Sequence, residues 1–216
     1  QLPLVLSLFP NEGAAIVNAM LTVVEMEGNF PIGYRLARGY DRFSHQASAL
    51  GHVVIADAFH RRLPGIDWER ALTLMSKDLG REYGEAFFQD GVVHPLTHTL
   101  DLAYGCFCTA AIATEIGDVT VAEQMLEYAS QWKNAFDQTG VLKDSTYYEG
   151  SKYNYSFRLL HDMASRISLA GGDSAFVDLL DTFFGYAADP ISAPGVSPSR
   201  AEMAEGELLG RFEGFN

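Results

Sequence analysis

A stretch near residue 150 holds the residues best suited to chemistry. Glu149 precedes Gly150, and further aromatic and polar side chains follow, among them Tyr153, Asn154 and His161. Aromatic faces stack on sugar rings, amides bond sugar hydroxyls, and a carboxyl group flanked by apolar rings can have its pKa raised enough to act as an acid. This composition is typical of a carbohydrate site. The ordinary alternative is a solvated glutamate followed by tyrosines that pack into a core.

Two further segments place polar residues just before predicted helices. Residues 28–42 and 90–98 are both rich in turn formers and in charged or histidine side chains. In a helical toroid, the loops at one end of the inner helices line a funnel. We therefore expect Glu149 to face a concave surface shared with both segments. The neighbouring pair His161 and Asp162 falls in a predicted helix, where such a pair is more often a structural hydrogen bond.

Composition limits the class of partner. The chain has 216 residues, 48% of them hydrophobic, so it can bury a large core. Its formal net charge is −13. The negative charge argues against nucleic acid and against an anionic membrane surface, because their phosphates need Lys and Arg opposite them. No apolar run approaches the ~20 residues that span a bilayer. The apolar residues 2–9 lack the basic flank of a signal peptide.

No metal site is predicted from residue spacing. Cys106 and Cys108 lie two apart in a predicted helix, so they point to different faces and are expected to be small buried residues. His52 and His60 share a helix face, but no cysteine or carboxylate lies at ligand spacing, which disfavours zinc.

Apolar residues recur at helical spacing through most of the chain. The pattern predicts helices over about residues 11–25, 44–58, 67–75, 97–117, 118–132, 153–169, 173–183 and 199–209, with caps at Asn11, Ser44, Asp67, Thr97 or Thr99, and Asp118 or Thr120. No convincing strand alternation is present, since residues 2–9 and 141–142 are too short for a sheet. The helix at 97–117 is apolar on more than one face. These features predict an all-α fold of antiparallel hairpins, with inner and outer helices as in an α/α toroid.

Four segments, in order along the chain, resemble glycoside hydrolase family 92, the calcium-dependent exo-acting α-mannosidases. Residues 51–59 resemble the family's segment that ends in Val-Ile-Ala-Asp-Ala-Tyr, and residues 99–104 resemble its Thr-Leu-Glu-Tyr-Ala-Tyr. Residues 132–137 resemble its Tyr-Lys-Asn-x-Phe-Asp. Residues 149–162 resemble its Glu-Gly-Asn-x-Trp-Gln-Tyr-x-Trp followed by x-x-x-His-Asp, without a gap.

The resemblance implies roles for the residues around Glu149. Glu149 would be the general acid of an inverting α-mannosidase-like enzyme. Tyr153, Asn154 and His161 would line the sugar pocket or support Glu149. The substrate would be an α-mannoside or a related glycan. Tyr153 and Asn154 stand where the family often has Trp and Gln, which bears on sugar specificity more than on the fold.

The resemblance also implies that residues 1–216 are a single incomplete catalytic domain, part of an (α/α)6 toroid. The β-sandwich that precedes the toroid in this family and the C-terminal part of the barrel would be absent. The general base and most calcium ligands are expected beyond Asn216. We therefore expect calcium in the full-length enzyme and none in this fragment, which should be inactive alone and could self-associate through exposed barrel faces. The full-length protein is expected to be secreted or periplasmic.

Two other classes of function stay open at this point. A helical toroid piece with degenerate site loops could be a non-catalytic interaction or scaffolding domain. An α/α-toroid polysaccharide lyase or another glycosidase is also compatible, because a lyase needs a Tyr or His base with an Arg or Asn neutraliser, and Tyr153 and Arg158 are available. A Gly-Asn-Glu continuation beyond Asn216 would favour the mannosidase.

Overall fold

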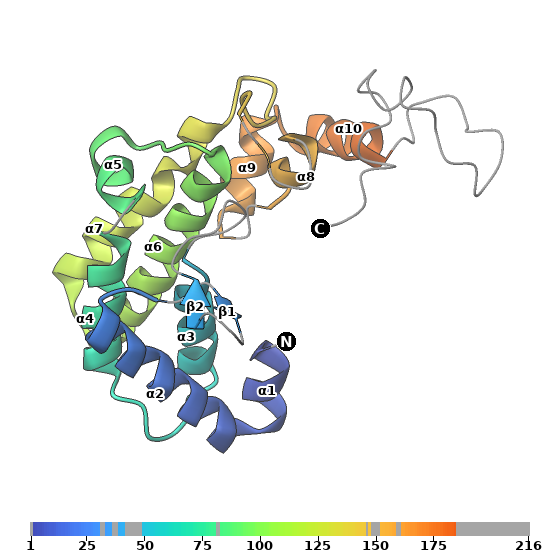
Figure 1. Ribbon diagram of the computed structural model, residues 1–216. Helices are drawn as coiled ribbons and strands as arrows, with labels where there is room; N and C mark the ends of the chain where they lie inside the picture. The colour runs from blue at the N-terminus through green and yellow to red at the C-terminus, as the bar shows by residue number, and fades with distance from the viewer. Residues whose placement is uncertain are drawn as a thin grey trace. The chain divides into compact units, whose positions relative to one another are not determined.

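The computed structural model describes residues 2–30, 33–35, 39–41, 49–80, 83–145, 147, 152–158 and 161–184. The chain divides into two compact units, residues 1–133 and residues 134–216 (Figure 1). No helix among the described residues is long and apolar enough to cross a membrane.

The first unit consists mainly of helices. Its elements are α1 (Leu2–Leu8), α2 (Pro10–Glu27), β1 (Gly33–Arg35), β2 (Gly39–Asp41), α3 (Leu50–His60), α4 (Trp68–Leu79), α5 (Tyr83–Asp90), α6 (Leu96–Ile116) and α7 (Val119–Ala129), followed by the 3-10 helix η1 (Ser130–Ala135), which crosses into the second unit.

The long helix α6 is the centre of the first unit. It packs against α7, α3, α4 and α5, and side chains on all its sides are buried, including the polar Thr97, His98 and Thr99. A helix that is apolar around its whole circumference must be covered on more than one side, so the sequence prediction of a doubly packed helix is confirmed. Burial raises the pKa of both Cys106 and Cys108, which are free thiols in this helix, as expected of small core residues.

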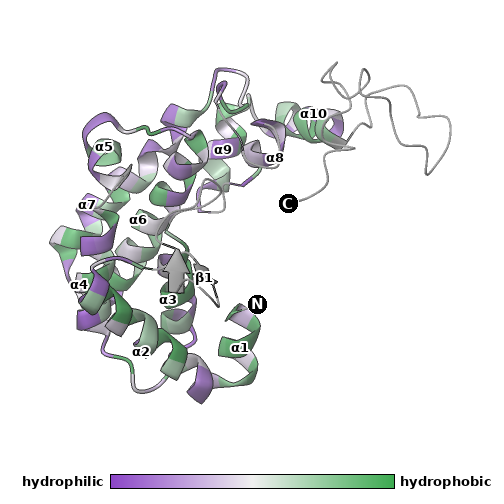
Figure 2. Ribbon diagram, in the orientation of Figure 1, coloured by the Kyte–Doolittle hydropathy of each residue, from purple (hydrophilic) through white to green (hydrophobic). Residues whose placement is uncertain are grey.

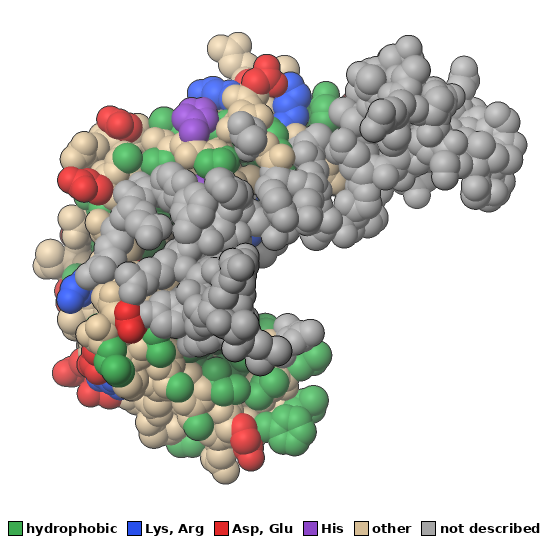
Figure 3. Space-filling view, viewed as in Figure 1, with side chains coloured by type: hydrophobic (Ala, Val, Ile, Leu, Met, Phe, Trp, Pro, Cys, Tyr) green, Lys and Arg blue, Asp and Glu red, His purple; other side chains and the backbone are tan. Residues whose placement is uncertain are grey.

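The N-terminal apolar run forms a helix, where the sequence predicted only a run too short for a sheet. α1 buries Leu6 but leaves Leu4 and Leu8 66% exposed. Figure 2 shows α1 as hydrophobic along much of its length, and Figure 3 shows apolar side chains gathered where it ends. Pro10 then begins α2, with Phe9 as its N-cap residue. The predicted cap at Asn11 is wrong, because a proline in the first turn already provides helical φ without needing a donor.

A small antiparallel ribbon was not predicted. β1 and β2 pair with Tyr34 opposite Tyr40, within the segment 28–42 that the sequence indicated as a loop. Three-residue strands carry too little alternation to be detected as a pattern. The predicted start of the next helix at Ser44 lies outside the described residues, and α3 begins at Leu50.

Several predicted helix ends agree with the structure. Asp67 and Asp118 accept hydrogen bonds from the backbone N–H groups of Arg70 and Val121, as N-caps do, and α6 ends on Gly117 in the left-handed conformation. The predicted N-caps of α6, Thr97 or Thr99, are wrong, because α6 begins at Leu96 and both threonines lie inside the helix. Helix α5 was missed, and the predicted helix at 199–209 lies outside the described residues.

The second unit contains α8 (Lys152–Ser156), α9 (Met163–Leu169) and α10 (Asp173–Phe184). The sequence predicted one helix over 153–169, and this is wrong. The side chain of Asp162 accepts a hydrogen bond from the backbone N–H of Ser165 and thereby caps α9 as a new helix. α10 agrees with its predicted range. Residues 136 and 142 form an isolated antiparallel bridge before α8.

Candidate functional site

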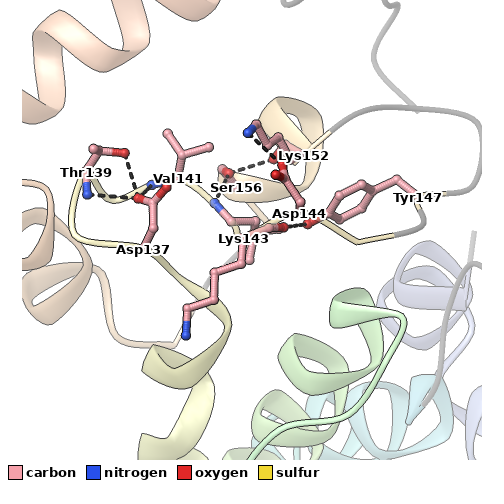
Figure 4. Close-up of polar contacts among 9 residues, drawn as sticks. Asp137, Thr139, Val141, Lys143, Asp144, Tyr147, Lys152 and Ser156 are labelled. Atoms are coloured by element: carbon pink, nitrogen blue, oxygen red, sulfur yellow. Dashed lines mark hydrogen bonds and ion pairs between the residues drawn. The ribbon is translucent and has the colours of Figure 1, made fainter.

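Glu149, the predicted general acid, lies outside the described residues, as do its neighbours 148, 150 and 151. Its predicted position on a shared concave surface therefore stays a prediction. The residues on both sides of this segment, Tyr147 and α8, are described. They make the contacts that define what we call the 147–156 frame, formed by residues 142–144, 147 and 152–156 (Figure 4).

Two tyrosines connect the two sides of the frame. The rings of Tyr147 and Tyr155 stack with their centroids 5.6 Å apart and their planes at 20°. The hydroxyl of Tyr147 donates to the carbonyl of Lys143 at 2.6 Å. Burial, with a smaller contribution from the charge of Asp144, raises the pKa of Tyr147. This phenol is therefore a protonated donor with a fixed partner and is unsuited to act as a base.

Ionic and buried hydrogen bonds reinforce the frame. Lys152 Nζ lies 2.9 Å from an oxygen of Asp144, which raises the pKa of the lysine. The hydroxyl of Ser156, which is fully buried, accepts the backbone N–H of Leu142 at 2.9 Å. The same hydroxyl donates to the carbonyl of Lys152 at 2.6 Å. The exposed ion pair between Lys152 and Asp144 contributes little to stability because water screens it. The buried hydroxyl of Ser156 is therefore the stronger connection between residue 142 and α8.

The turn before the frame is held by Asp137. One carboxylate oxygen accepts the backbone N–H of Thr139 at 2.8 Å, its hydroxyl at 2.6 Å and the backbone N–H of Val141 at 3.2 Å (Figure 4). Burial alone would raise the pKa of Asp137, but these hydrogen bonds favour the charged form and lower it overall. The turn thereby directs the chain back toward α8.

Arg166 on α9 is a buried cation. Its side chain is 1% exposed and donates to the carbonyls of Gly140 and Ser156. The guanidinium lies 4.6 Å from the ring centroid of Phe136, and two more phenylalanine rings are within 6.0 Å. Burial lowers the pKa of Arg166 to about 10, which leaves it charged at neutral pH. It therefore joins the 137–141 turn, the end of α8 and α9.

The three predicted sugar-binding residues fall on or beside this arrangement. Tyr153 and Asn154 are partly exposed on α8, between the anchoring residues Lys152 and Tyr155. His161 is also partly exposed and precedes the cap residue of α9 instead of lying inside a helix. All three are accessible from solvent. Whether they contact a sugar stays a prediction.

The segment after α2 in the first unit is tied to its helices through Asp78. An oxygen of Asp78 accepts the backbone N–H of Phe30 at 2.8 Å, and the other lies 3.7 Å from His52 Nε2. His52 Nε2 also lies 3.0 Å from the carbonyl oxygen of Met75. A side chain at Gly51 would meet the Phe30 ring at 2.8 Å, so this glycine is required by close packing. His52 is thus a structural core histidine.

Residues 90–98 are tied to α6 through Thr99. Its hydroxyl accepts the backbone N–H of Val93 at 2.8 Å and donates to the carbonyl of the same residue at 2.9 Å. This reciprocal contact fixes the segment against the first turn of α6. Thr99 lies in residues 99–104, one of the four segments that resemble the family. In the structure its side chain holds the loop of residues 90–98 in place.

The described residues do not fit a metal site. No three His, Cys, Asp or Glu side chains among them lie close enough to hold an ion, whereas calcium takes about six to eight oxygen ligands. The calcium expected in the full-length enzyme stays a prediction.

Replacing Ser156 by alanine should destabilise the frame. The substitution removes the acceptor of the buried Leu142 N–H, and leaving such a group unpaired costs about 1–3 kcal/mol. Urea unfolding should show this loss in the free energy of unfolding. Ser174→Ala, at an exposed position of α10, is the matched control and should change stability by less than about 0.5 kcal/mol. Equal effects of the two substitutions would contradict a special role for Ser156.

Sequence reasoning missed the residues that hold this region together: Tyr147 as an anchor, Ser156, Arg166 and the Asp137 turn. One signal was available for the turn, since Asp-x-Thr-Gly at 137–140 is a typical turn sequence. The signal for Arg166 was weaker: a cation next to the apolar Ile167 in a predicted helix. The contacts of Ser156 and Tyr147 join residues that no sequence pattern pairs.

Comparison with protein families gives one match. The chain matches the model of the glycosyl hydrolase family 92 catalytic domain over residues 1–144 and 138–207. The two matched ranges include most of both compact units. A comparison with curated proteins finds no match.

Solved structures of mannosidases are similar in fold. The family GH92 α-mannosidase BT3965 from Bacteroides thetaiotaomicron is 20% identical, with a TM-score of 0.68 over 79% of this chain and 26% of that one. Its complex with mannoimidazole gives 20% identity and a TM-score of 0.67 over 84% and 28%. The GH92 inverting mannosidase BT2199 from B. thetaiotaomicron VPI-5482 is 19% identical, with a TM-score of 0.66 over 91% and 31%.

These likenesses confirm the predicted fold class, an all-α fold of antiparallel hairpins that forms part of an (α/α)6 toroid. The chain spans less than a third of the length of the solved mannosidases that it matches, between 26% and 31%.

Proposed function

We propose, from the premise that this chain belongs to glycosyl hydrolase family 92, that it supplies the general acid of an enzyme that hydrolyses α-mannosides. The 147–156 frame carries this proposal. Tyr147 and Lys152 bound the segment that contains Glu149. Tyr147 is held by its hydrogen bond to Lys143 and by stacking on Tyr155, and the helix that begins at Lys152 is held by the buried hydroxyl of Ser156. A proton donor must be held in place relative to the bond that it cleaves, and fixed ends on both sides of Glu149 serve this need.

In the proposed reaction, the carboxyl group of Glu149 donates its proton to the glycosidic oxygen as the bond to the anomeric carbon breaks. A water molecule attacks the anomeric carbon from the opposite face, and a second carboxylate takes a proton from that water. The products are a sugar of inverted configuration and the released alcohol. Inversion needs the two carboxyl groups about 6.5–9.5 Å apart, so that the water fits between them.

Tyr153, Asn154 and His161 are proposed to contact the sugar. The phenol and the amide lie partly exposed on α8, and such groups stack on sugar rings and bond their hydroxyls. Of the solved structures that the chain resembles, one is described as an inverting mannosidase and one holds mannoimidazole. These descriptions support a mannoside as substrate and inversion as the outcome.

The second carboxylate and the calcium ligands are proposed to lie outside this chain. The family match supports a glycosidase over a polysaccharide lyase. The guanidinium of Arg158, the neutraliser that a lyase would need, lies over the ring of the buried Tyr155 at 5.8 Å. The match to a catalytic-domain family supports an enzyme over a scaffolding domain.

Hydrolysis of 4-nitrophenyl α-mannoside by the complete protein that carries this chain tests the proposal. We expect release of nitrophenol and, by proton NMR at early times, the β-anomer of mannose as first product. The 216-residue chain alone should release none. Initial appearance of the α-anomer would contradict inversion, and no reaction with any α-mannoside would contradict the substrate class.

A further inference from the structure

The connection between α3 and α4 opens into a pocket of ≈ 270 Å³ on the first unit. We call it the α3–α4 pocket, and its lining residues are Phe59, His60, Arg62, Leu63, Trp68 and Glu115. Glu115 belongs to the C-terminal end of α6, whereas residues 90–98 lead into its N-terminal end. Since α6 has 21 residues and a helix rises about 1.5 Å per residue, roughly 30 Å of helix separates the two ends.

The backbone of Arg62 occupies a place that normally belongs to glycine. Its φ is +57°, in the left-handed region. Its N–H donates to the carbonyl of Phe59 at 2.8 Å, and the N–H of Leu63 donates to Ala58 at 3.2 Å, which is the Schellman pattern that ends a helix. The corresponding positions after α2 and α6 are glycines, Gly28 and Gly117.

A side chain at this place costs stability. A residue with a Cβ in the left-handed conformation is less stable than glycine by about 1 kcal/mol. The helix end therefore explains the conformation of Arg62 but not the presence of an arginine there. An arginine at this place adds a guanidinium that the helix end itself does not use.

The charged groups of the pocket are available for a ligand. Arg61, the neighbour of Arg62, forms an ion pair with Asp57 at 3.0 Å. Within the part of the chain that the structure describes, neither Arg62 nor Glu115 makes an ion pair or a side-chain hydrogen bond. Both are exposed, so the pocket presents guanidinium donors and carboxylate acceptors together.

The apolar part of the pocket is rigid. The rings of Phe59 and Trp68 meet edge to face, with centroids 5.0 Å apart and planes at 84°. Both are partly buried and pack against the core of the first unit, in which Leu63 is buried. A fixed aromatic wall beside polar groups binds ligands that have both an apolar face and hydroxyls.

We infer that the α3–α4 pocket binds one ring of a neutral saccharide. The opposite charges of Arg62 and Glu115 leave no preference for an anionic or a cationic ligand from these two side chains, and a purely apolar ligand would bury both charges without partners. A neutral sugar accepts from the guanidinium, donates to the carboxylate and places its C–H face on an aromatic ring. The volume is slightly below the ~300–1,000 Å³ usual for small-molecule sites, which suits a single ring.

The inference goes beyond the proposed function, since it assigns a second glycan contact that needs no catalytic group. Only the choice of probe rests on that function. Mannan should retard the complete protein that carries this chain in native gels, and the retardation should depend on the residues of the α3–α4 pocket.

Two substitutions make the test specific. Arg62→Gly removes the guanidinium and relieves the left-handed backbone, so the affinity for mannan should fall about 10–100-fold while the melting temperature stays equal or rises. Glu115→Gln should weaken binding by a similar factor. Glu123→Gln, on an exposed part of α7, is the matched control and should bind as the original does.

The outcomes separate this inference from the proposed function. Loss of mannan retardation in both pocket variants, with unchanged hydrolysis of 4-nitrophenyl α-mannoside, supports a second site. Unchanged retardation in both variants overturns it, whether or not the protein hydrolyses mannosides. A lower melting temperature for Arg62→Gly would show that Arg62 serves the fold. Retardation by polygalacturonate, an anionic polymer, in place of mannan would overturn the neutral class.

Discussion

Replacing Glu149 by glutamine in the complete protein should lower kcat for α-mannoside hydrolysis by about 10²–10⁴-fold, the usual contribution of a general acid. Glutamine has nearly the same shape and can still hydrogen-bond, but it cannot transfer a proton. Substrate binding should therefore change little. Steady-state kinetics on a natural mannoside, whose leaving group is a poor one, measures the effect.

The choice of leaving group provides an internal control for this experiment. A 2,4-dinitrophenyl group departs without protonation, so Glu149→Gln should lose much less activity on 2,4-dinitrophenyl α-mannoside than on the natural substrate. Glu123→Gln, at an exposed position of α7, should leave both rates unchanged. Near-normal turnover of the natural mannoside by Glu149→Gln would remove Glu149 from the role of general acid.

Replacing Arg166 by alanine should cost about 3–5 kcal/mol of stability, the largest loss that we expect from one substitution in the second unit. The carbonyls of Gly140 and Ser156 lose their donor. The space between the phenylalanine rings that surround the guanidinium is left unfilled. Urea unfolding measures the loss as a fall in the free energy of unfolding.

Two comparison variants divide this loss into its causes. Arg166→Met fills the volume but donates no hydrogen bond, so it should cost less than alanine, about 1–3 kcal/mol for the unpaired carbonyls. Arg61→Ala removes an arginine whose ion pair is exposed and should cost less than about 1 kcal/mol. If Arg166→Ala were as stable as Arg61→Ala, the guanidinium would not hold the second unit together.

The fold was largely predictable because long amphipathic helices carry strong periodic signals. α2, α4, α6, α7 and α10 were all predicted near their observed ranges, and Asp67 and Asp118 cap as expected. The prediction for residues 153–169 failed because this stretch contains no glycine or proline that would mark a break. The separate helix α9 begins at the local cap by Asp162 and is held by the tertiary contacts of Arg166.

The residue types of the candidate site could be proposed from the sequence, but the contacts that support it could not. Glu149, Tyr153 and Asn154 stand out because their chemistry suits a sugar. Ser156 does not stand out, because a serine gives no sign of which distant N–H it will accept. A family resemblance therefore suggested Glu149 as the acid, whereas the partner of each anchoring residue is seen only in the fold.

The stacking of Tyr147 on Tyr155 has a consequence for conformational entropy. Fixing the backbone of one residue costs about 1–2 kcal/mol, and a segment that must become ordered when substrate binds subtracts that cost from affinity. Because the frame is already formed in the folded chain, the residues at both ends of the Glu149 segment contribute no such cost. Under the proposed function, the binding free energy of the sugar would not be reduced by ordering these residues.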